Sequence, residues 1–363
     1  MHPLCRPHVD NTVRLCYPIT RLARGTDVTY ASYMELKLKE TPENLRDLVN
    51  SQADFIIDNQ LPSGAIPWYR GGVTDPWDHV EGAIALDLAG RCTEAAVAYA
   101  WSRTMQNPDG SWYHSYQDDR ALNSIKDTNF TSYFATGIWF HYLATGDRDF
   151  LSGMWPSVSN AIDFTLSLQQ PAGEIPWACN DEGVVWPNAI LTSDCCIWHS
   201  IRNAIKIAGV LGIDKPDWDN ASVRLLEAIR KRPELFDRMG ENRRRYAMNW
   251  FYPVLTGVVT GEEAREHINR EWADFIIEGW GCRVAADEDV TAVAETGELI
   301  IALCLIGEHE KAGLLLDWTL RLRDSEGGFC RGIKLPQEEA CPPERATWTS
   351  AALILAIAAM CRA

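Results

Sequence analysis

The chain lacks the features that would assign it to several large functional classes. No apolar run approaches the roughly 20 residues that a membrane-spanning helix needs, and the longest lies at residues 351–361. The first residues contain no apolar segment typical of a secretory signal peptide, so we expect a cytoplasmic protein. The formal net charge of -16 argues against a nucleic-acid partner and against electrostatic attraction to an anionic membrane.

Motifs for common cofactors and for a serine nucleophile are also missing. The sequence contains no P-loop, no GxGxxG after a strand and no GxSxG. Its eleven cysteines include no CxxC, and we interpret them as reduced, buried thiols. Asp194, Cys196 and His199 have a spacing that could hold zinc, but no further His occupies a matching position. We therefore expect neither a metal nor another cofactor.

A short turn motif recurs through the chain. It consists of Gln, a turn with Gly and then an aromatic residue, at residues 106–112, 60–68 and 170–177, with a weaker copy at 325–329. Each copy follows one amphipathic segment and precedes another. This periodicity is typical of a repeat architecture.

The copies differ at the position before the Gly, which is Asp109 in the central one. The other copies have Ser63, Ala172 and Glu326 there, so the turn itself does not require an acid. One interpretation of Asp109 is a solvated turn residue that bonds its own backbone. The alternative is that Asp109 is available for chemistry.

The hydrophobic pattern predicts twelve helices in six pairs. In each pair the first helix is charged on one face, whereas the second is apolar nearly all round and therefore buried. This alternation favours an all-α fold, an (α/α)6 toroid with an inner and an outer ring in a single domain at residues 41–363, preceded by an arm at 1–40. The expected helices are 41–60, 78–89, 93–106, 127–145, 149–169, 193–211, 220–230, 246–259, 262–277, 290–306, 310–323 and 348–361.

In such a toroid the loops that lead from outer to inner helices surround one mouth of a central cavity. These loops and the inner helices supply many aromatic residues, and there are fifteen Trp in all. Each one taken alone could simply pack the two rings, but together they predict an aromatic-lined, dry cavity that would stabilise cations. The candidate substrate-binding residues are Trp68, Tyr69, Trp77, Trp112, Tyr113, Phe134, Trp177, Trp198, Trp250, Trp280 and Trp348.

Acidic residues near this mouth are the candidate catalytic groups. Asp109 is the first choice as a proton donor, provided that burial beside Trp112 raises its pKa. Glu295 and Glu298 lie in a strongly apolar helix, and burying either without a partner would be costly, so Glu295 is a candidate for a bond in the cavity. Asp289 belongs to an acidic cluster at 287–289 that could equally cap a helix.

A further cluster lies at the start of the first inner helix, where Asp75, Asp78 and Glu81 surround His79. His79 could orient a proton donor, or it could make a structural contact. We include His79 among the catalytic candidates.

The turns resemble the QW motif of the squalene–hopene and oxidosqualene cyclases, through Gln106, Asp109, Gly110 and Trp112. Residues 287–292 resemble the DxDDTA acid motif of those enzymes, with Val290 in place of its last Asp. Since this chain is long enough for one toroid only, it is most similar to a monodomain class II terpene cyclase of the merosterolic acid synthase type.

That resemblance implies a metal-independent isomerase that forms meroterpenoids. The reaction would be a protonation-initiated cyclisation of a linear polyprene with an aromatic acid head group, with Asp109 as the acid and Asp289 in reserve. The hydrophobic substrate implies contact with a membrane surface, although no basic amphipathic helix marks one. The head-group carboxylate would pair with Arg70, Arg283, Arg331 or Arg345.

Two other function classes stay open. In a six-hairpin glycoside hydrolase, Trp residues would stack sugars, and Asp109 with Asp127, Asp289 or Glu295 would form the carboxylate pair. The other class is a non-catalytic isoprenoid-binding or prenyltransferase-like protein. A closed, dry cavity would favour the cyclase, whereas an open groove with two hydrated carboxylates would favour the glycosidase.

Overall fold

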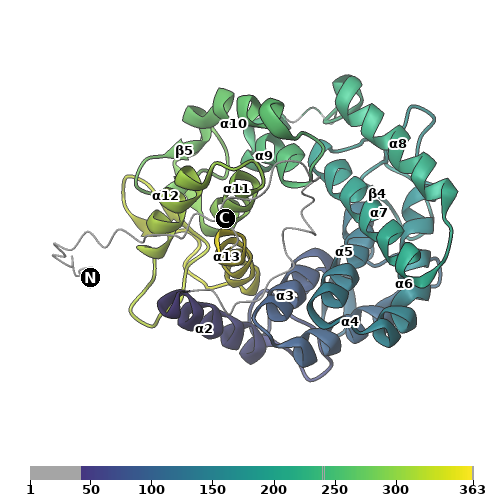
Figure 1. The fold of residues 1–363 in the computed structure, drawn as a ribbon, viewed down its shortest axis with the longest axis horizontal. Helices are drawn as coiled ribbons and strands as arrows, with labels where there is room; N and C mark the ends of the chain where they lie inside the picture. Colours follow the sequence, from purple (N-terminus) through teal and green to yellow (C-terminus); the bar gives the residue numbers. More distant parts are fainter. Residues whose placement is uncertain (1–41, 239, 241, 362–363) are drawn as a thin grey trace.

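Twelve helices form two concentric rings in the computed structural model, which describes residues 42–238, 240 and 242–361. The inner ring runs α3, α5, α7, α9, α11 and α13, and α13 packs back against α3 to close it. Figure 1 shows this ring surrounded by the outer helices. The prediction of an (α/α)6 toroid is therefore confirmed, while the arm expected at 1–40 lies outside the described residues.

The inner and outer helices alternate along the chain, as the hydrophobic pattern predicts. The outer helices are α2 (Glu43–Asn59), α4 (Cys92–Met105), α6 (Arg148–Ser167), α8 (Pro216–Lys231), α10 (Gly261–Phe275) and α12 (His309–Leu320). The inner helices are α3 (Pro76–Leu88), α5 (Thr128–Thr145), α7 (Leu191–Leu211), α9 (Ala247–Leu255), α11 (Val293–Leu305) and α13 (Thr347–Met360). No helix among the described residues is long and apolar enough to cross a membrane.

Several helix ends follow the expected local signals. The Asp127 side chain accepts a hydrogen bond from the Phe130 amide at the start of α5, and Gly146 ends that helix in the left-handed conformation. Gly212 ends α7 in the same way. The fifth inner helix begins at Val293 rather than at the expected residue 290, because residues 290–292 form a strand.

Short strands in the long loops are the main feature that the sequence did not predict. They form small antiparallel sheets: β1 (Ser115–Gln117) with β2 (Arg120–Asn123), β3 (Lys126–Asp127) with β4 (Ala178–Cys179), β5 (Ile276–Ile277) with β6 (Gly281–Cys282), and β7 (Val290–Ala292) with β8 (Gly332–Lys334) and β9 (Glu339–Ala340). Single turns of 3₁₀ helix, η2 (Pro233–Leu235) and η3 (Arg243–Arg245), lie in the loop between α8 and α9. These pairings fix the loops that surround the mouth.

The repeated Gln of the turns joins each turn to the next outer helix. The Nε2 atom of Gln106 donates to the carbonyl of Gly110 and to that of Ser157 in α6. Gln60 bonds Gly64 and Glu94 in the same way. In the third turn the equivalent residue is Gln169, not the expected Gln170. The motif is thus a packing device of the toroid.

The glycine of the turn is required by both conformation and space. Gly64, Gly110 and Gly173 have φ of 104°, 93° and 109°, a region that other residues rarely adopt. A Cβ at each would collide with a backbone carbonyl of the next outer helix. The turn therefore recurs because six helix pairs must pack side by side.

The first and last helix pairs meet to close the ring. Ser350 in α13 donates to the Oε1 atom of Gln52 in α2 over 2.9 Å, and the other end of the Gln52 amide donates to the Gly327 carbonyl. Thr347 at the start of α13 bonds the carbonyl of Pro67 in the first long loop. The Thr347 amide also donates to the Trp68 carbonyl over 2.8 Å, so backbone and side-chain bonds together join the two ends of the ring.

Candidate functional site

The mouth of the barrel lies where the six inner helices begin. All the long loops lead from an outer helix to an inner one, so the N-terminal turns of the inner helices face the same end. The sixth residues of five inner helices line a central cavity of about 30 Å³: Glu81, Tyr133, Cys196, Tyr252 and Glu298. Residues three positions earlier share that helix face and lie one turn nearer the mouth.

Four carboxylates occupy these two layers. Asp78 and Glu295 are the third residues of α3 and α11, and Glu81 and Glu298 are the sixth residues of the same helices. The two helices flank α13 in the inner ring. The structure thus presents an upper pair, Asp78 and Glu295, above a lower pair, Glu81 and Glu298.

In the lower pair Glu81 is buried and Glu298 is half-buried, and both favour the protonated form. Burial, together with the charges of Asp75 and Glu295, raises the pKa of Glu81 to about 8. Burial and the charge of Glu81 raise the pKa of Glu298 well above its usual range. The Tyr252 hydroxyl donates to Glu298 over 2.6 Å and holds this side chain in place.

The upper pair differs in its charged surroundings. Burial raises the pKa of the half-buried Asp78 carboxyl, and the negative charges of Asp75 and Glu81 raise it further. Burial also raises the pKa of Glu295, but the guanidinium of Arg331 opposes that rise. The Oε2 atom of Glu295 is buried, and no described residue donates a hydrogen bond to it.

Glu295 also borders a cavity at the mouth with a volume of about 170 Å³. Asn249, Tyr246 and Arg243 from the region of α9 line it, together with Thr192 at the start of α7. The mouth is therefore roomier than the 30 Å³ interior, which holds about one or two water molecules. Any substrate larger than that must react at the mouth.

Aromatic residues and one cation form the wall between the upper carboxylates. The Arg331 guanidinium lies 5.9 Å from the Trp68 ring and 5.2 Å from the Trp348 ring. The Trp68 indole donates to Asp75 over 2.6 Å, and Asp75 in turn caps α3. The Nε atom of Arg331 and the Nε1 atom of Trp348 are buried donors without an acceptor among the described residues.

The remaining predicted aromatics divide between the mouth and the protein core. Trp77 packs against Phe130, Tyr133 and Tyr252 inside the mouth, and Trp177 stacks on Trp186. In contrast, Trp112 with Phe134, and Trp250 with Phe275, pack between the rings. Tyr69 is exposed, Trp280 lies in the turn before β6, Trp198 lies half-buried in α7, and Tyr113 hydrogen-bonds Asp181.

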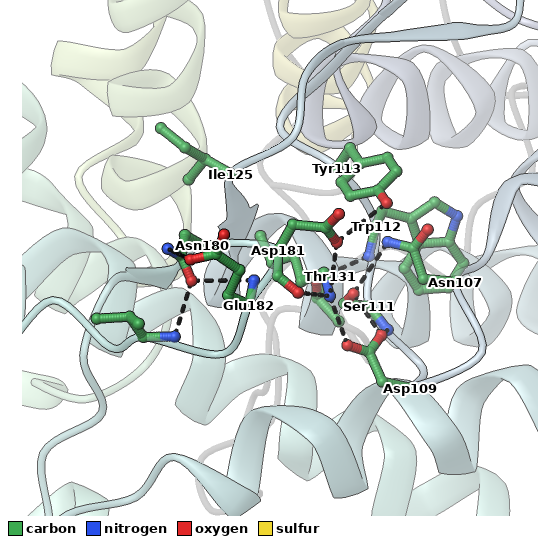
Figure 2. Close-up of polar contacts among 12 residues, drawn as sticks. Asn107, Asp109, Ser111, Trp112, Tyr113, Ile125, Thr131, Asn180, Asp181 and Glu182 are labelled. Atoms are coloured by element: carbon green, nitrogen blue, oxygen red, sulfur yellow. Dashed lines mark hydrogen bonds and ion pairs between the residues drawn. The ribbon is translucent and has the colours of Figure 1, made fainter.

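Asp109 lies away from the mouth, on the outer side of the loops. Its carboxylate accepts hydrogen bonds from Ser111 and from the Lys126 ammonium, the latter over 2.8 Å, and Figure 2 shows it in this loop beside Ser111. These bonds hold the pKa of Asp109 below its usual value despite partial burial. The prediction that Asp109 is dry and protonated is therefore wrong, because its side chain is 42% exposed and its lowered pKa keeps it ionised.

His79 and Asp289 also differ from their predicted roles. Both ring nitrogens of the buried His79 bind backbone, one accepting from the Ile66 amide and the other contacting the Ala98 carbonyl, and burial lowers its pKa to about 4. Asp289 is exposed and pairs with Arg283 over 2.7 Å.

The residue at the helix position of His79, the fourth in the inner helix, also holds the preceding loop in other repeats. Thr131, Asp194 and Thr296 are likewise the fourth residues of their inner helices, and each accepts from the amide of a residue in the preceding loop. Asp194, considered above as a zinc ligand, accepts from Ile175.

Comparisons with known proteins decide between the function classes. No family model matches the chain. It is 44% identical over 322 residues to an MMP endo-(1,4)-3-O-methyl-alpha-D-mannosidase from Mycolicibacterium hassiacum, and the match covers 89% of this chain and 87% of that protein. The chain belongs to the family of that mannosidase.

Two solved structures share the fold of this chain. A glycosidase matches with a TM-score of 0.69 over 93% of this chain and 99% of its own, at 13% identity. A D-mannose isomerase matches with a TM-score of 0.70 over 90% of this chain and 99% of its own, at 8% identity.

The assignment to terpene cyclases is therefore wrong, as are the isomerase activity, the meroterpenoid product and the prenylated substrate. The turn motif that suggested them packs neighbouring helix pairs in this toroid. The interior of about 30 Å³ is also too small for a polyprene.

The upper and lower carboxylates were only partly recognised from the sequence. Glu295 was a candidate, whereas Asp78, Glu81 and Glu298 were noted without a role. The available signal was the same spacing in two inner helices, Asp78-x-x-Glu81 and Glu295-x-x-Glu298. Such a spacing places both acids on one helix face.

Proposed function

We propose that the protein is a glycoside hydrolase that cleaves α-(1,4) linkages in a polysaccharide of 3-O-methylmannose. The observation that carries this proposal is the upper carboxylate pair, Asp78 and Glu295, at the mouth of a chain from the mannosidase family. Glycosidases characteristically use two carboxylates on either side of the scissile bond. The relative's name supplies the substrate class.

Asp78 is the proposed general acid. Its neighbours Asp75 and Glu81 disfavour a further negative charge, so Asp78 retains its proton. It would deliver that proton to the glycosidic oxygen as the bond to the anomeric carbon breaks. Water then supplies the new oxygen on that carbon and loses one proton to a carboxylate of the pair, which completes hydrolysis.

Glu295 is the proposed second carboxylate, acting at the anomeric carbon opposite the leaving group. Burial raises the pKa of both carboxyls, but Arg331 opposes that rise at Glu295, whereas Asp75 and Glu81 add to it at Asp78. Two acids whose environments separate their pKa values in this way are suited to an acid and a base. The lower pair, Glu81 and Glu298, would support the upper pair from below.

The wall formed by Trp68, Arg331 and Trp348 is the proposed binding surface for the sugar. Ligand sites combine aromatic faces with a few oriented polar groups, and this wall has both. The free donors on Arg331 and Trp348 would bond sugar oxygens. We also retain the prediction that the protein is cytoplasmic.

A direct assay tests this function. Purified full-length protein, incubated with an α-(1,4)-linked 3-O-methylmannose polysaccharide, should release shorter oligosaccharides with new reducing ends, which mass spectrometry would detect. An unmethylated α-(1,4)-glucan of equal length serves as the comparison. No new reducing end from any α-mannoside would refute the proposal.

Replacing Asp109 by Asn should leave this hydrolysis nearly unchanged. Asp109 is exposed and lies outside the mouth, and Lys126 keeps a second partner in Asp181 at 3.1 Å. The Lys126 side chain is only 9% exposed but keeps this second partner, so we expect a modest fall in the urea midpoint. Steady-state kinetics and urea unfolding would check this, and a loss of kcat above about tenfold would contradict it.

A further inference from the structure

A second groove lies on the rim of the mouth, between the loop from α6 to α7 and the loop from α8 to α9. Its volume is about 570 Å³, and Gln170, Glu174, Asn188 and Arg238 line it together with prolines. We refer to it as the rim groove. It is separate from the cavity beside Glu295, with which it shares no lining residue.

Glu174 is the most unusual residue of the rim groove. Only 6% of the residue and 8% of its side chain are exposed. Its Oε2 atom nevertheless receives no hydrogen bond from any described residue, and its Oε1 atom lies 3.8 Å from Arg238. A buried carboxylate oxygen without a donor is costly, so the site is suited to a ligand that donates a hydrogen bond.

An aromatic pair adjoins the groove. Trp177 and Trp186 stack with their centroids 5.5 Å apart and their planes 18° from parallel. Trp186 lies between Val185 and Pro187, which both line the groove. The Nε1 atom of Trp177 is another buried donor without an acceptor in the described part of the chain.

The same loop connects the rim groove to the mouth. The Trp177 amide donates to the Asn188 carbonyl, and the Trp177 carbonyl accepts from the Thr128 amide at the start of α5. Phe130, two residues further along α5, contacts Trp77 inside the mouth. A flexible polymer held at the mouth could therefore extend across Trp177 to the groove.

We infer that the rim groove is a distal subsite for neutral, hydroxyl-rich sugar units of the polysaccharide whose cleavage is proposed above. A sugar hydroxyl would donate to Glu174 Oε2, and the donors of Arg238 and Asn188 would bond sugar oxygens. The negative charge of Glu174 and the positive charge of Arg238 offset each other, so the groove suits a neutral ligand rather than an anionic one. This inference rests on the proposed function.

The test compares a long substrate with a short one. Glu174→Gln keeps the shape of the side chain but removes its charge, and Arg238→Gln removes the neighbouring charge contributed by the loop from α8 to α9. Relative to the wild type, we expect kcat/KM on the polysaccharide to fall about tenfold more than kcat/KM on a short aryl α-mannoside, because a hydrogen bond to a charged group is lost. The fall should appear in KM rather than in kcat.

Glu182→Gln is the matched control. It removes the same charge from the same loop, but Glu182 is exposed and lines a different depression beside Asp109, where Figure 2 shows it next to Asp181. We expect the ratio of kcat/KM on the polysaccharide to kcat/KM on the short mannoside to equal that of the wild type. Thermal melting would establish that each variant is folded, and Arg238→Gln, at an exposed position, tests the groove if Glu174→Gln does not fold.

Each outcome is decisive. A ratio that falls in the groove variants but not in Glu182→Gln supports the distal subsite. An unchanged ratio in Arg238→Gln and in folded Glu174→Gln overturns it while hydrolysis itself persists. If the wild type cleaves neither substrate, the proposed function fails instead, and titration calorimetry with methylmannose oligosaccharides still decides whether the groove binds them.

Discussion

Replacing Asp78 by Asn should lower kcat on the methylmannose polysaccharide by about 10³-fold, the scale typical of losing a general acid. Asn occupies nearly the same volume but cannot deliver a proton to the glycosidic oxygen. Because the wild-type acid must be protonated, its rate should also fall as pH rises and Asp78 loses its proton. Steady-state kinetics as a function of pH would measure both effects.

Asp289→Asn is the control for this experiment. It is the acid that the cyclase motif would select, yet it is exposed and paired with Arg283, so its replacement should leave kcat within about threefold of the wild type. Equal melting temperatures would exclude unfolding as the cause of any loss. Wild-type turnover in Asp78→Asn, or a large loss in Asp289→Asn alone, would remove Asp78 from the acid role.

Replacing Asp87 by Asn should destabilise the protein by about 3–5 kcal/mol. Asp87 in α3 and His141 in α5 form a buried pair at 2.8 Å, with side-chain exposures of 1% and 4%, and Tyr99 from α4 donates to the same carboxylate. Removing the acid leaves two polar groups of neighbouring helices without a charged partner in the core. Urea unfolding should show a lower midpoint with an unchanged slope.

An exposed ion pair with the same separation of 2.8 Å provides the control. Asp54 and Arg91 also lie 2.8 Å apart, but their side chains are 60% and 38% exposed. Asp54→Asn should therefore cost less than about 1 kcal/mol. Similar losses in the two variants would show that burial of Asp87 does not matter, and would refute the argument.

The toroid could be predicted because its cause is local. An inner helix is apolar on every side, an outer helix on one side, and this difference is visible in the sequence of each segment. Helix ends were also predictable where one residue decides them, as at Asp127 and Gly146. The boundary at Val293 was missed because strand pairing with β8, far along the chain, shortens the helix.

The candidate site was harder to predict from the sequence, because function and packing use the same residue types. The turn with Gln106 and Gly110 resembled a cyclase motif, yet its Gln bonds the next outer helix and its Gly avoids a collision there. Asp109 appeared exceptional among the copies, but its partner Lys126 lies seventeen residues away and could not be assigned from sequence. The folded structure is also needed to show that Glu81 lines the small interior cavity, whereas Asp78 lies one turn nearer the mouth.

Closure of the ring through Gln52 and Ser350 has a consequence for how the chain folds. The two residues are 298 positions apart, so this contact gives the protein a large contact order. Loop-closure entropy opposes such contacts, which makes the final step slow compared with forming each helix pair. During synthesis α3 and α11 each keep an open apolar flank until α13, the last inner helix to emerge, fills the gap between them.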